Sequence, residues 1–155
     1  RVKVSGIKGA PKTDSYKVSI NYHKGYKASG TLTISGPDAY EKAQKCSEII
    51  WQRLKNVGCS FEETNTEFLG LNSCHGNINP LPEQINEVVL RLGVKDPDQN
   101  KISRFGKELA PLVTNGPAGV TGFAGGRPKP REIVAFWPAL IDKKLIETKV
   151  TVEEV

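Results

Sequence analysis

The feature that most restricts the fold is a period-two alternation of apolar and polar residues between positions 15 and 34. Such alternation is typical of strands with one buried and one solvated face, so a helix cannot cover more than one side of this sheet. A short segment containing a glycine, residues 23–25, separates two alternating runs, and we predict a β-hairpin that turns there. The apolar positions of the two runs are Tyr16, Val18, Ile20, Tyr22, Tyr26, Ala28, Leu32 and Ile34.

Helical spacing begins directly after this alternating region. An apolar stripe that includes Ala39, Cys46 and Leu54 predicts a helix over residues 38–57, lying across the apolar face of the hairpin. Two more helices are predicted, one over residues 82–92 and one that begins at 96–98 and ends at Ala110, before Pro111. Further strands are predicted at residues 2–4, 60–71, 133–141 and 146–152, and the segment 133–141 is apolar on both faces, as in a central strand.

These elements predict an α+β fold. We expect a two-layer sandwich in which a mixed or antiparallel β-sheet carries about three helices on one face. The 155 residues suit a single domain spanning positions 1–155. A hydrophobic content of 37% and a charged content of 25% are typical of globular proteins, and no apolar run approaches the ~20 residues of a membrane helix. The expected location is the cytoplasm, with no membrane partner.

Glycines are dense between positions 116 and 126, and a basic segment interrupted by prolines follows them. Their spacing and their place before a strand fit neither the dinucleotide-binding fingerprint nor the P-loop. Two interpretations stay open: the loop binds an anion, or it is an ordered packing element whose arginines pair with carboxylates. The candidate anion-binding residues are Gly119, Gly122, Gly125, Gly126, Arg127, Lys129 and Arg131.

The sequence shows no arrangement of residues typical of a catalytic or metal site. His23 and His75 are its two histidines, and adjacent residues such as Cys74 and His75 seldom have the geometry of a nucleophile with its base. Three cysteines, an odd number, argue against a disulfide scaffold and a zinc site. We therefore expect no catalytic residue and no metal ligand, and no cofactor is indicated. The lysines of residues 1–35 fall mainly at outward strand positions, which is typical of a solvated face and not of a nucleic-acid interface.

Several motifs carry a resemblance to a known family. They are Leu-Ala-Pro-Leu-Val at 109–113, Gly-Pro-Ala-Gly-Val-Thr-Gly-Phe-Ala-Gly-Gly-Arg-Pro at 116–128 and Phe-Trp-Pro at 136–138. With these motifs, the chain resembles the acyclic terpene utilisation protein A family along most of its length. Proteins of that family are longer, so the resemblance implies that this chain is a C-terminal portion. The family is associated with bacterial breakdown of acyclic terpenoids through branched acyl-CoA esters. Its biochemical activity is undefined, so no catalytic residue is transferred.

The resemblance and the residues together lead to two alternative expectations. In the first, the chain is a binding or assembly domain linked to acyclic terpenoid catabolism and is not catalytic by itself. In the second, residues 119–131 form part of an enzyme active site that holds a CoA or phosphate group. The expected partners are the N-terminal region of the same protein, a second copy joined through the strand edges at 60–71 or 133–141, and an acyl-CoA or other anionic small molecule. No nucleic-acid partner is expected.

Overall fold

The computed structural model describes residues 1–71, 73–78, 80–122 and 125–154. Its contacts divide the chain into two compact units. One unit contains Arg1–Tyr22 and Ala135–Val155, and the other contains His23–Val134. Strand β1 (Ser15–Ser35) contributes residues to both units.

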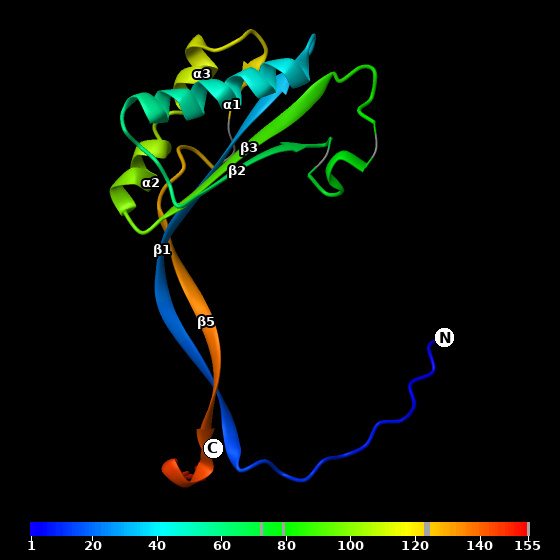
Figure 1. Cartoon of the computed structure of the whole chain (residues 1–155), viewed down its shortest axis with the longest axis vertical. Helices are drawn as coiled ribbons and strands as arrows, with labels where there is room; N and C mark the ends of the chain where they lie inside the picture. Colours follow the sequence, from blue (N-terminus) through cyan, green and yellow to red (C-terminus); the bar gives the residue numbers. More distant parts are fainter. Residues whose placement is uncertain (72, 79, 123–124, 155) are drawn as a thin grey trace. The chain divides into compact units, whose positions relative to one another are not determined.

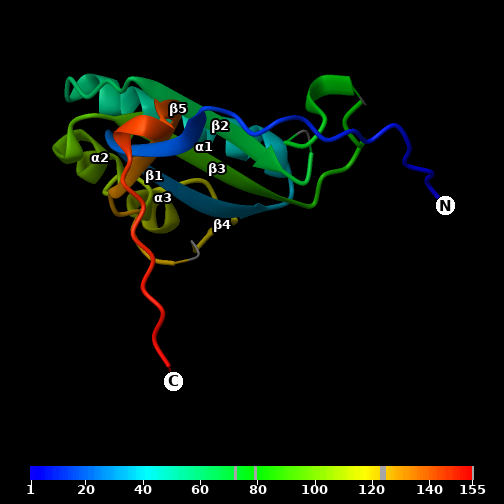
Figure 2. The same ribbon diagram turned by 90° about the horizontal axis from the view of Figure 1, so that it is seen from below.

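The larger unit, His23–Val134, is built on an antiparallel sheet. The second half of β1 pairs with β3 (Glu87–Asp96) and with the short β4 (Val120–Thr121), and β3 pairs with β2 (Glu63–Leu69). The strand order is therefore β2-β3-β1-β4. Figure 1 shows these strands in the chain, and Figure 2 shows from another side that β3 lies between β1 and β2. The prediction of an α+β chain with an antiparallel sheet is confirmed.

One face of this sheet carries the hydrophobic core. The even-numbered positions of β3 and those from Ala28 to Ile34 of β1 are buried, and they face helix α1 (Ala39–Asn56), which lies across the strands. Each fully buried leucine or isoleucine contributes about 1.5–3 kcal/mol to folding. Helix α2 (Gln99–Phe105) adds Ile102 and Phe105, and α3 (Ala110–Asn115) adds Leu112. The predicted helix over residues 38–57 and its buried stripe are confirmed by α1.

The hairpin predicted around residues 23–25 is wrong, because β1 continues through Gly25 without a turn. The glycine serves a close approach instead. Its φ is +91°, and a Cβ at this position would lie 3.0 Å from the carbonyl oxygen of Asp96 and 3.1 Å from Cα of Pro97. The antiparallel partner of the second alternating run is β3, in a register that runs from Tyr26↔Asp96 to Ser35↔Glu87.

Two helix predictions in this unit are also wrong. The segment predicted as a helix over 82–92 contains the start of β3, because Val88 and Leu92 fit a period of two as well as a period of four. The helix predicted to end before Pro111 ends at Phe105. Pro111 lies in the first turn of α3, where its missing N–H costs nothing because the first turn leaves its N–H groups unpaired. A 3₁₀ turn, η1 (Gly76–Ile78), precedes β3.

The smaller unit contains a two-stranded ribbon. Strand β5 (Arg131–Asp142) pairs with β1, and the N–H of Lys143 donates to the carbonyl of Asp14 at 2.9 Å, so the end of β5 lies beside the start of β1 (Figure 1). A second 3₁₀ turn, η2 (Lys143–Leu145), follows β5. The strands predicted at 2–4 and 146–152 are wrong, because neither segment is extended into a sheet.

The apolar residues of this ribbon are not buried in the chain itself. Trp137 is 63% exposed and Leu140 is 74% exposed, so the interpretation of 133–141 as a central strand is wrong. The first run of the alternation behaves in the same way, since Tyr16, Ile20 and Tyr22 are exposed. A continuous apolar segment indicates that both faces of a strand are to be buried. It does not indicate whether the same chain or another one buries them.

Candidate functional site

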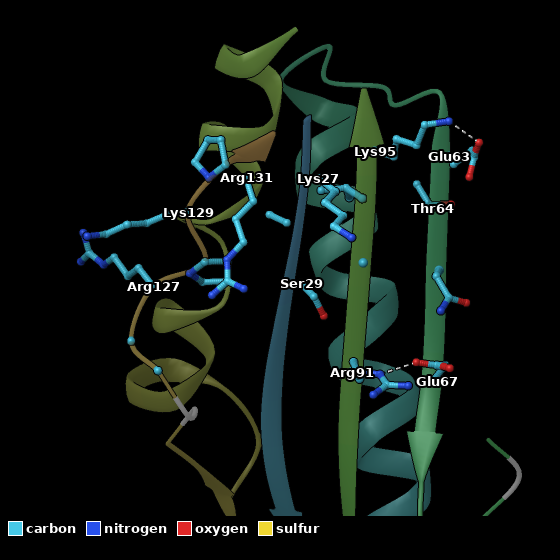
Figure 3. A pocket seen from close by; sticks show the side chains of 18 residues that line it. Lys27, Ser29, Glu63, Thr64, Glu67, Arg91, Lys95, Arg127, Lys129 and Arg131 are labelled. Carbon is cyan, nitrogen blue, oxygen red and sulfur yellow. Dashed lines mark hydrogen bonds and ion pairs between the residues drawn. The ribbon is translucent and has the colours of Figure 1, made fainter. Parts of the chain in front are cut away.

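An open hollow of about 940 Å³ lies within the larger unit, on the polar face of the sheet. Residues paired across antiparallel strands share one face, so the odd-numbered positions of β1, β3 and β2 form rows across this surface. One row holds Lys27, Lys95 and Glu63, the next Ser29, Gly93 and Asn65, and a third Thr31, Arg91 and Glu67. Figure 3 shows the side chains of this surface on the side of the strands opposite α1.

The two outer rows contain ion pairs between β3 and β2. The amine of Lys95 lies 2.6 Å from Glu63 Oε1 and 3.5 Å from Glu62 Oε2, and the guanidinium of Arg91 donates to Glu67. The hydrogen bond from Lys95 lowers the pKa of Glu63, and the hydrogen bond from Arg91 lowers the pKa of Glu67. These two cations are thus neutralised by neighbours on the same face, and both carboxylates stay ionised.

The middle row leaves a gap between these ion pairs. Gly93 has no side chain, and it lies between Ser29 on β1 and Asn65 on β2. A Cβ added at Gly93 would lie 3.6 Å from Cβ of Asn65 and 4.0 Å from the carbonyl oxygen of Ala28, which are ordinary contacts. Packing of the fold therefore does not require a glycine at position 93. The backbone of Gly93 forms the floor of the hollow.

The basic segment, residues 125–131, lines the hollow beside β1. Pro128 fixes its position: a Cβ at Gly30 would lie 2.6 Å from Cγ of Pro128, and a Cβ at Gly106 would overlap the carbonyl oxygen of Pro128. Gly30 belongs to β1, and Gly106 is the residue that ends α2. Two glycines therefore let the basic segment dock closely on both elements.

Four of the six cations that line the hollow form no ion pair with any carboxylate of the described residues. These four are Lys27, Arg127, Lys129 and Arg131. In Figure 3, Lys27 extends over β3 and Arg131 runs alongside β1, whereas Arg127 and Lys129 extend together away from the strands. The hollow is thus electropositive, with two cations beside its floor and two on its outer rim.

The comparison with known families decides which family includes this chain. A family model described as acyclic terpene utilisation family protein AtuA matches residues 1–152. The chain belongs to this family. The match covers every residue of the hollow, and membership points to a role in acyclic terpene utilisation. No curated protein and no solved structure matches the chain.

The AtuA-family chain brings five of its seven candidate anion-binding residues together. Gly125, Gly126, Arg127, Lys129 and Arg131 all line the hollow. Gly125 and Gly126 have φ values of +76° and +74°, with nothing within 4 Å of an added Cβ, so the backbone conformation and not packing calls for glycine.

The other two candidates, Gly119 and Gly122, do not line the hollow. Gly119 joins β4 to the end of β1: its φ is +88°, its carbonyl accepts from the N–H of Ser35 at 2.9 Å, and a Cβ would lie 2.7 Å from the carbonyl oxygen of Ser35. Lys42 reinforces this junction, because its amine donates to Ser35 O at 2.6 Å and to Ala118 O at 2.9 Å. The packing interpretation therefore describes Gly119 well.

Sequence reasoning missed the strand residues of the hollow, namely Lys27, Ser29, Asn65 and Gly93. The polar half of the alternation was the signal that could have found Lys27 and Ser29, but outward polar residues are usually only solvated. Asn65 and Gly93 meet them through the pairing of β1, β3 and β2, which joins segments far apart in the sequence.

The cysteines and acidic residues of the AtuA-family chain form no comparable site. Burial raises the pKa of the thiols of Cys46 and Cys59, which keeps both protonated, and Cys74 is exposed. In the described ranges, no cluster of three or more His, Cys, Asp or Glu side chains has the geometry to hold a metal ion. Likewise, none of the helices in these ranges is long and apolar enough to cross a membrane.

Proposed function

We propose that this chain is a ligand-binding domain of an acyclic terpene utilisation protein, and that its hollow holds an anionic group of a small molecule. The observation that supports this proposal is the set of four cations, Lys27, Arg127, Lys129 and Arg131, which line one hollow and have no ion-pair partner in the described residues. Cations gathered in a concave surface raise the local concentration of anions and form strong charge-assisted hydrogen bonds with them.

The geometry of the basic segment supports binding of an anion with several oxygens. Arg127 and Arg131 carry planar guanidinium groups, which match phosphate and carboxylate oxygens two at a time. Pro128 and Pro130 alternate with the three cations and limit the freedom of the backbone. Since the segment is already docked on Gly30 and Gly106, binding costs little ordering of the chain.

The same residues support binding more than catalysis by this chain alone. The carboxylates of the hollow, Glu63 and Glu67, are held ionised by Lys95 and Arg91, so neither is suited to donate a proton near neutral pH. The alternative is that the hollow is one half of an active site that another part of a longer protein completes. Turnover of a terpenoid acyl-CoA by a longer family protein, abolished by Arg131→Ala and absent from this chain alone, would favour the alternative.

Isothermal titration calorimetry with coenzyme A and with inorganic pyrophosphate tests the proposal. At low ionic strength we expect both to bind, and we expect Lys27→Gln and Arg131→Gln each to weaken binding by about 10- to 100-fold, the value of one charge-assisted hydrogen bond. The matched control is Lys107→Gln, which removes an exposed lysine outside the hollow. The melting temperature of all three variants should stay close to that of the parent chain. Absence of binding, or equal loss in the control, would overturn the proposal.

A second candidate function is self-association, and the exposed apolar ribbon of β1 and β5 favours it. Phe136, Trp137 and Leu140 are each more than half exposed on β5, and Tyr16 and Ile20 are exposed on β1. A two-stranded ribbon is at best marginally stable alone in water, and exposed apolar surface of this kind marks an interface. We propose that a second copy of the chain covers the ribbon, and the molecular mass in solution tests this.

A further inference from the structure

The hollow has room for much more than one anion. Its volume of about 940 Å³ lies at the upper end of the range for small-molecule sites, which is about 300–1,000 Å³. The row of Ser29, Gly93 and Asn65 lies across three strands, and the basic segment borders it on the side of β1 only. A simple ion held by the cations would therefore leave the floor at Gly93 uncovered.

The floor is neutral and can form hydrogen bonds. The hydroxyl of Ser29 can both donate and accept a hydrogen bond. The side chain of Asn65 has an NH2 donor and a carbonyl acceptor, and it also hydrogen-bonds Glu67 in the neighbouring row. On β3, the floor is limited by Lys95 on one side and Arg91 on the other, each held by a glutamate of β2. These two positions are four residues apart, about 13 Å along an extended strand. A flat polar group fits between them, resting on the backbone of Gly93.

The four cations cannot all contact one anionic group. Arg127, Lys129 and Arg131 alternate with prolines, and in an extended chain of this kind the first and last are about 12 Å apart. Figure 3 shows Lys27 reaching over β3 and Arg131 beside β1, whereas Arg127 and Lys129 extend away from the strands. In total, six cationic side chains and two carboxylates line the hollow, so its positive charge exceeds what one monovalent anion neutralises.

We infer that the ligand is a phosphorylated organic molecule with more than one anionic oxygen group and a neutral, hydrogen-bonding body. One phosphate lies between Lys27 and Arg131, a further phosphate extends toward Arg127 and Lys129, and the body covers Gly93 between Ser29 and Asn65. This inference rests on the proposed anion-binding function and adds the chemical class of the ligand. A phosphate suits the site better than a carboxylate, because it offers three oxygens and up to two charges to cations on different sides.

Calorimetric titration of the chain with three probes tests the inference: inorganic pyrophosphate, adenosine 5′-diphosphate and adenosine. The nucleoside diphosphate combines the phosphates with a polar body, and each of the other two probes lacks one part. We expect the nucleoside diphosphate to bind about tenfold or more tightly than pyrophosphate, the value of one or two added hydrogen bonds, and adenosine to bind weakest.

Variants of the floor separate the body from the phosphates. Gly93→Val fills the floor and should reduce the affinity for the nucleoside diphosphate to that for pyrophosphate, without changing the pyrophosphate affinity. Asn65→Ala removes a hydrogen-bonding group from the same row without filling the space at Gly93. It should also reduce the affinity for the nucleoside diphosphate. Lys27→Gln should weaken the binding of both phosphate probes.

The outcomes distinguish this inference from the proposed function. Equal affinities for pyrophosphate and the nucleoside diphosphate, unchanged by Gly93→Val and Asn65→Ala, would overturn the inference and leave the anion site standing. Adenosine binding as tightly as its diphosphate would overturn it too, since the phosphates would then contribute nothing. Failure of every probe to bind would overturn the proposed anion site itself.

Discussion

Pro128 and Leu109 together occupy the space in which Gly30 would carry a side chain, and a Cβ at position 30 would lie 2.6 Å from Cγ of Pro128. The carbonyl of the same proline lies against Gly106 at the end of α2. The basic segment is therefore positioned by packing on β1 and α2, and this packing places its cations beside the hollow. Packing and anion binding, which the sequence leaves as alternatives, are compatible here because Pro128 makes the contacts, whereas Arg127, Lys129 and Arg131 form no ion pair with the described residues.

Substitution of Gly106 should reveal how firmly the basic segment is docked. Its φ is −59°, which alanine adopts readily, so any loss of stability in Gly106→Ala must come from the clash with Pro128. We expect a loss of about 1–3 kcal/mol, typical of overpacking, and a fall of several degrees in melting temperature measured by circular dichroism. Gly93→Ala is the matched control, because its added Cβ meets only ordinary contacts, and in the interior of β3 it should not lower stability. Equal effects of the two substitutions would contradict the docking.

Gly119 should behave as a structural glycine. In Gly119→Ala, the new side chain would be forced into a left-handed backbone conformation and would lie 2.7 Å from Ser35 O, so we expect a loss of about 1–3 kcal/mol from strain alone, with the clash added to it. Gly122→Ala is the control, since its φ is not positive and nothing lies within 4 Å of its added Cβ. Urea unfolding measures both. A stable Gly119→Ala protein that had lost pyrophosphate binding would instead return Gly119 to the anion site.

Asp96 should make the stability of the larger unit depend on acid pH. Burial of this carboxylate raises its pKa, but hydrogen bonds from the N–H of Asp98, the amine of Lys101 and the N–H of Glu62 outweigh that and hold the pKa below its ordinary value. The folded state therefore binds fewer protons than the unfolded state in the acid range. In the unfolded chain the pKa of an aspartate is about 3.9, and above this pH the stability that Asp96 contributes is fully present. It is lost as the pH falls from there through the lower pKa that Asp96 has in the folded state.

The variant Asp96→Asn isolates this contribution. Its cost at pH 6 should be about 1–3 kcal/mol, because buried N–H donors lose their charged acceptor, and the difference from the parent chain should shrink below about pH 4. Glu63 and Glu67 also have lowered pKa values, but they are present in both proteins and cancel in the difference. Urea unfolding between pH 2 and 6 gives the measurement. A difference that does not change with pH would refute the role assigned to the charge of Asp96.

The sequence predicts local elements well and the hollow only in part. The stripe from Ala39 to Leu54 determines α1 because helical periodicity is a local property. The course of the chain at Gly25 could not be read in this way, since that glycine allows a close approach to Asp96 on another strand, and a turn glycine looks the same in sequence. The floor of the hollow depends on the register of β1, β3 and β2, which is settled by long-range pairing. Arg127, Lys129 and Arg131 were accessible to prediction because glycines and prolines mark their segment.

The exposed ribbon leads to the last prediction, which concerns self-association. Within the described residues, β5 pairs only with β1, so its other edge presents unpaired backbone groups beside Trp137 and Leu140. Antiparallel pairing of this edge with the same edge of a second copy would pair the backbone groups of both edges. Such pairing has the two-fold symmetry of most homodimers. Light scattering should therefore give a mass about twice the 17.0 kDa of the chain. Trp137→Ser and Leu140→Ser should shift the mass toward the monomer, whereas Val57→Ser, which removes an exposed apolar residue outside the ribbon, should not. A monomeric mass at every concentration would refute the proposal that a second copy covers the ribbon. Binding of that monomer to the remainder of a longer family protein would show what covers the ribbon instead.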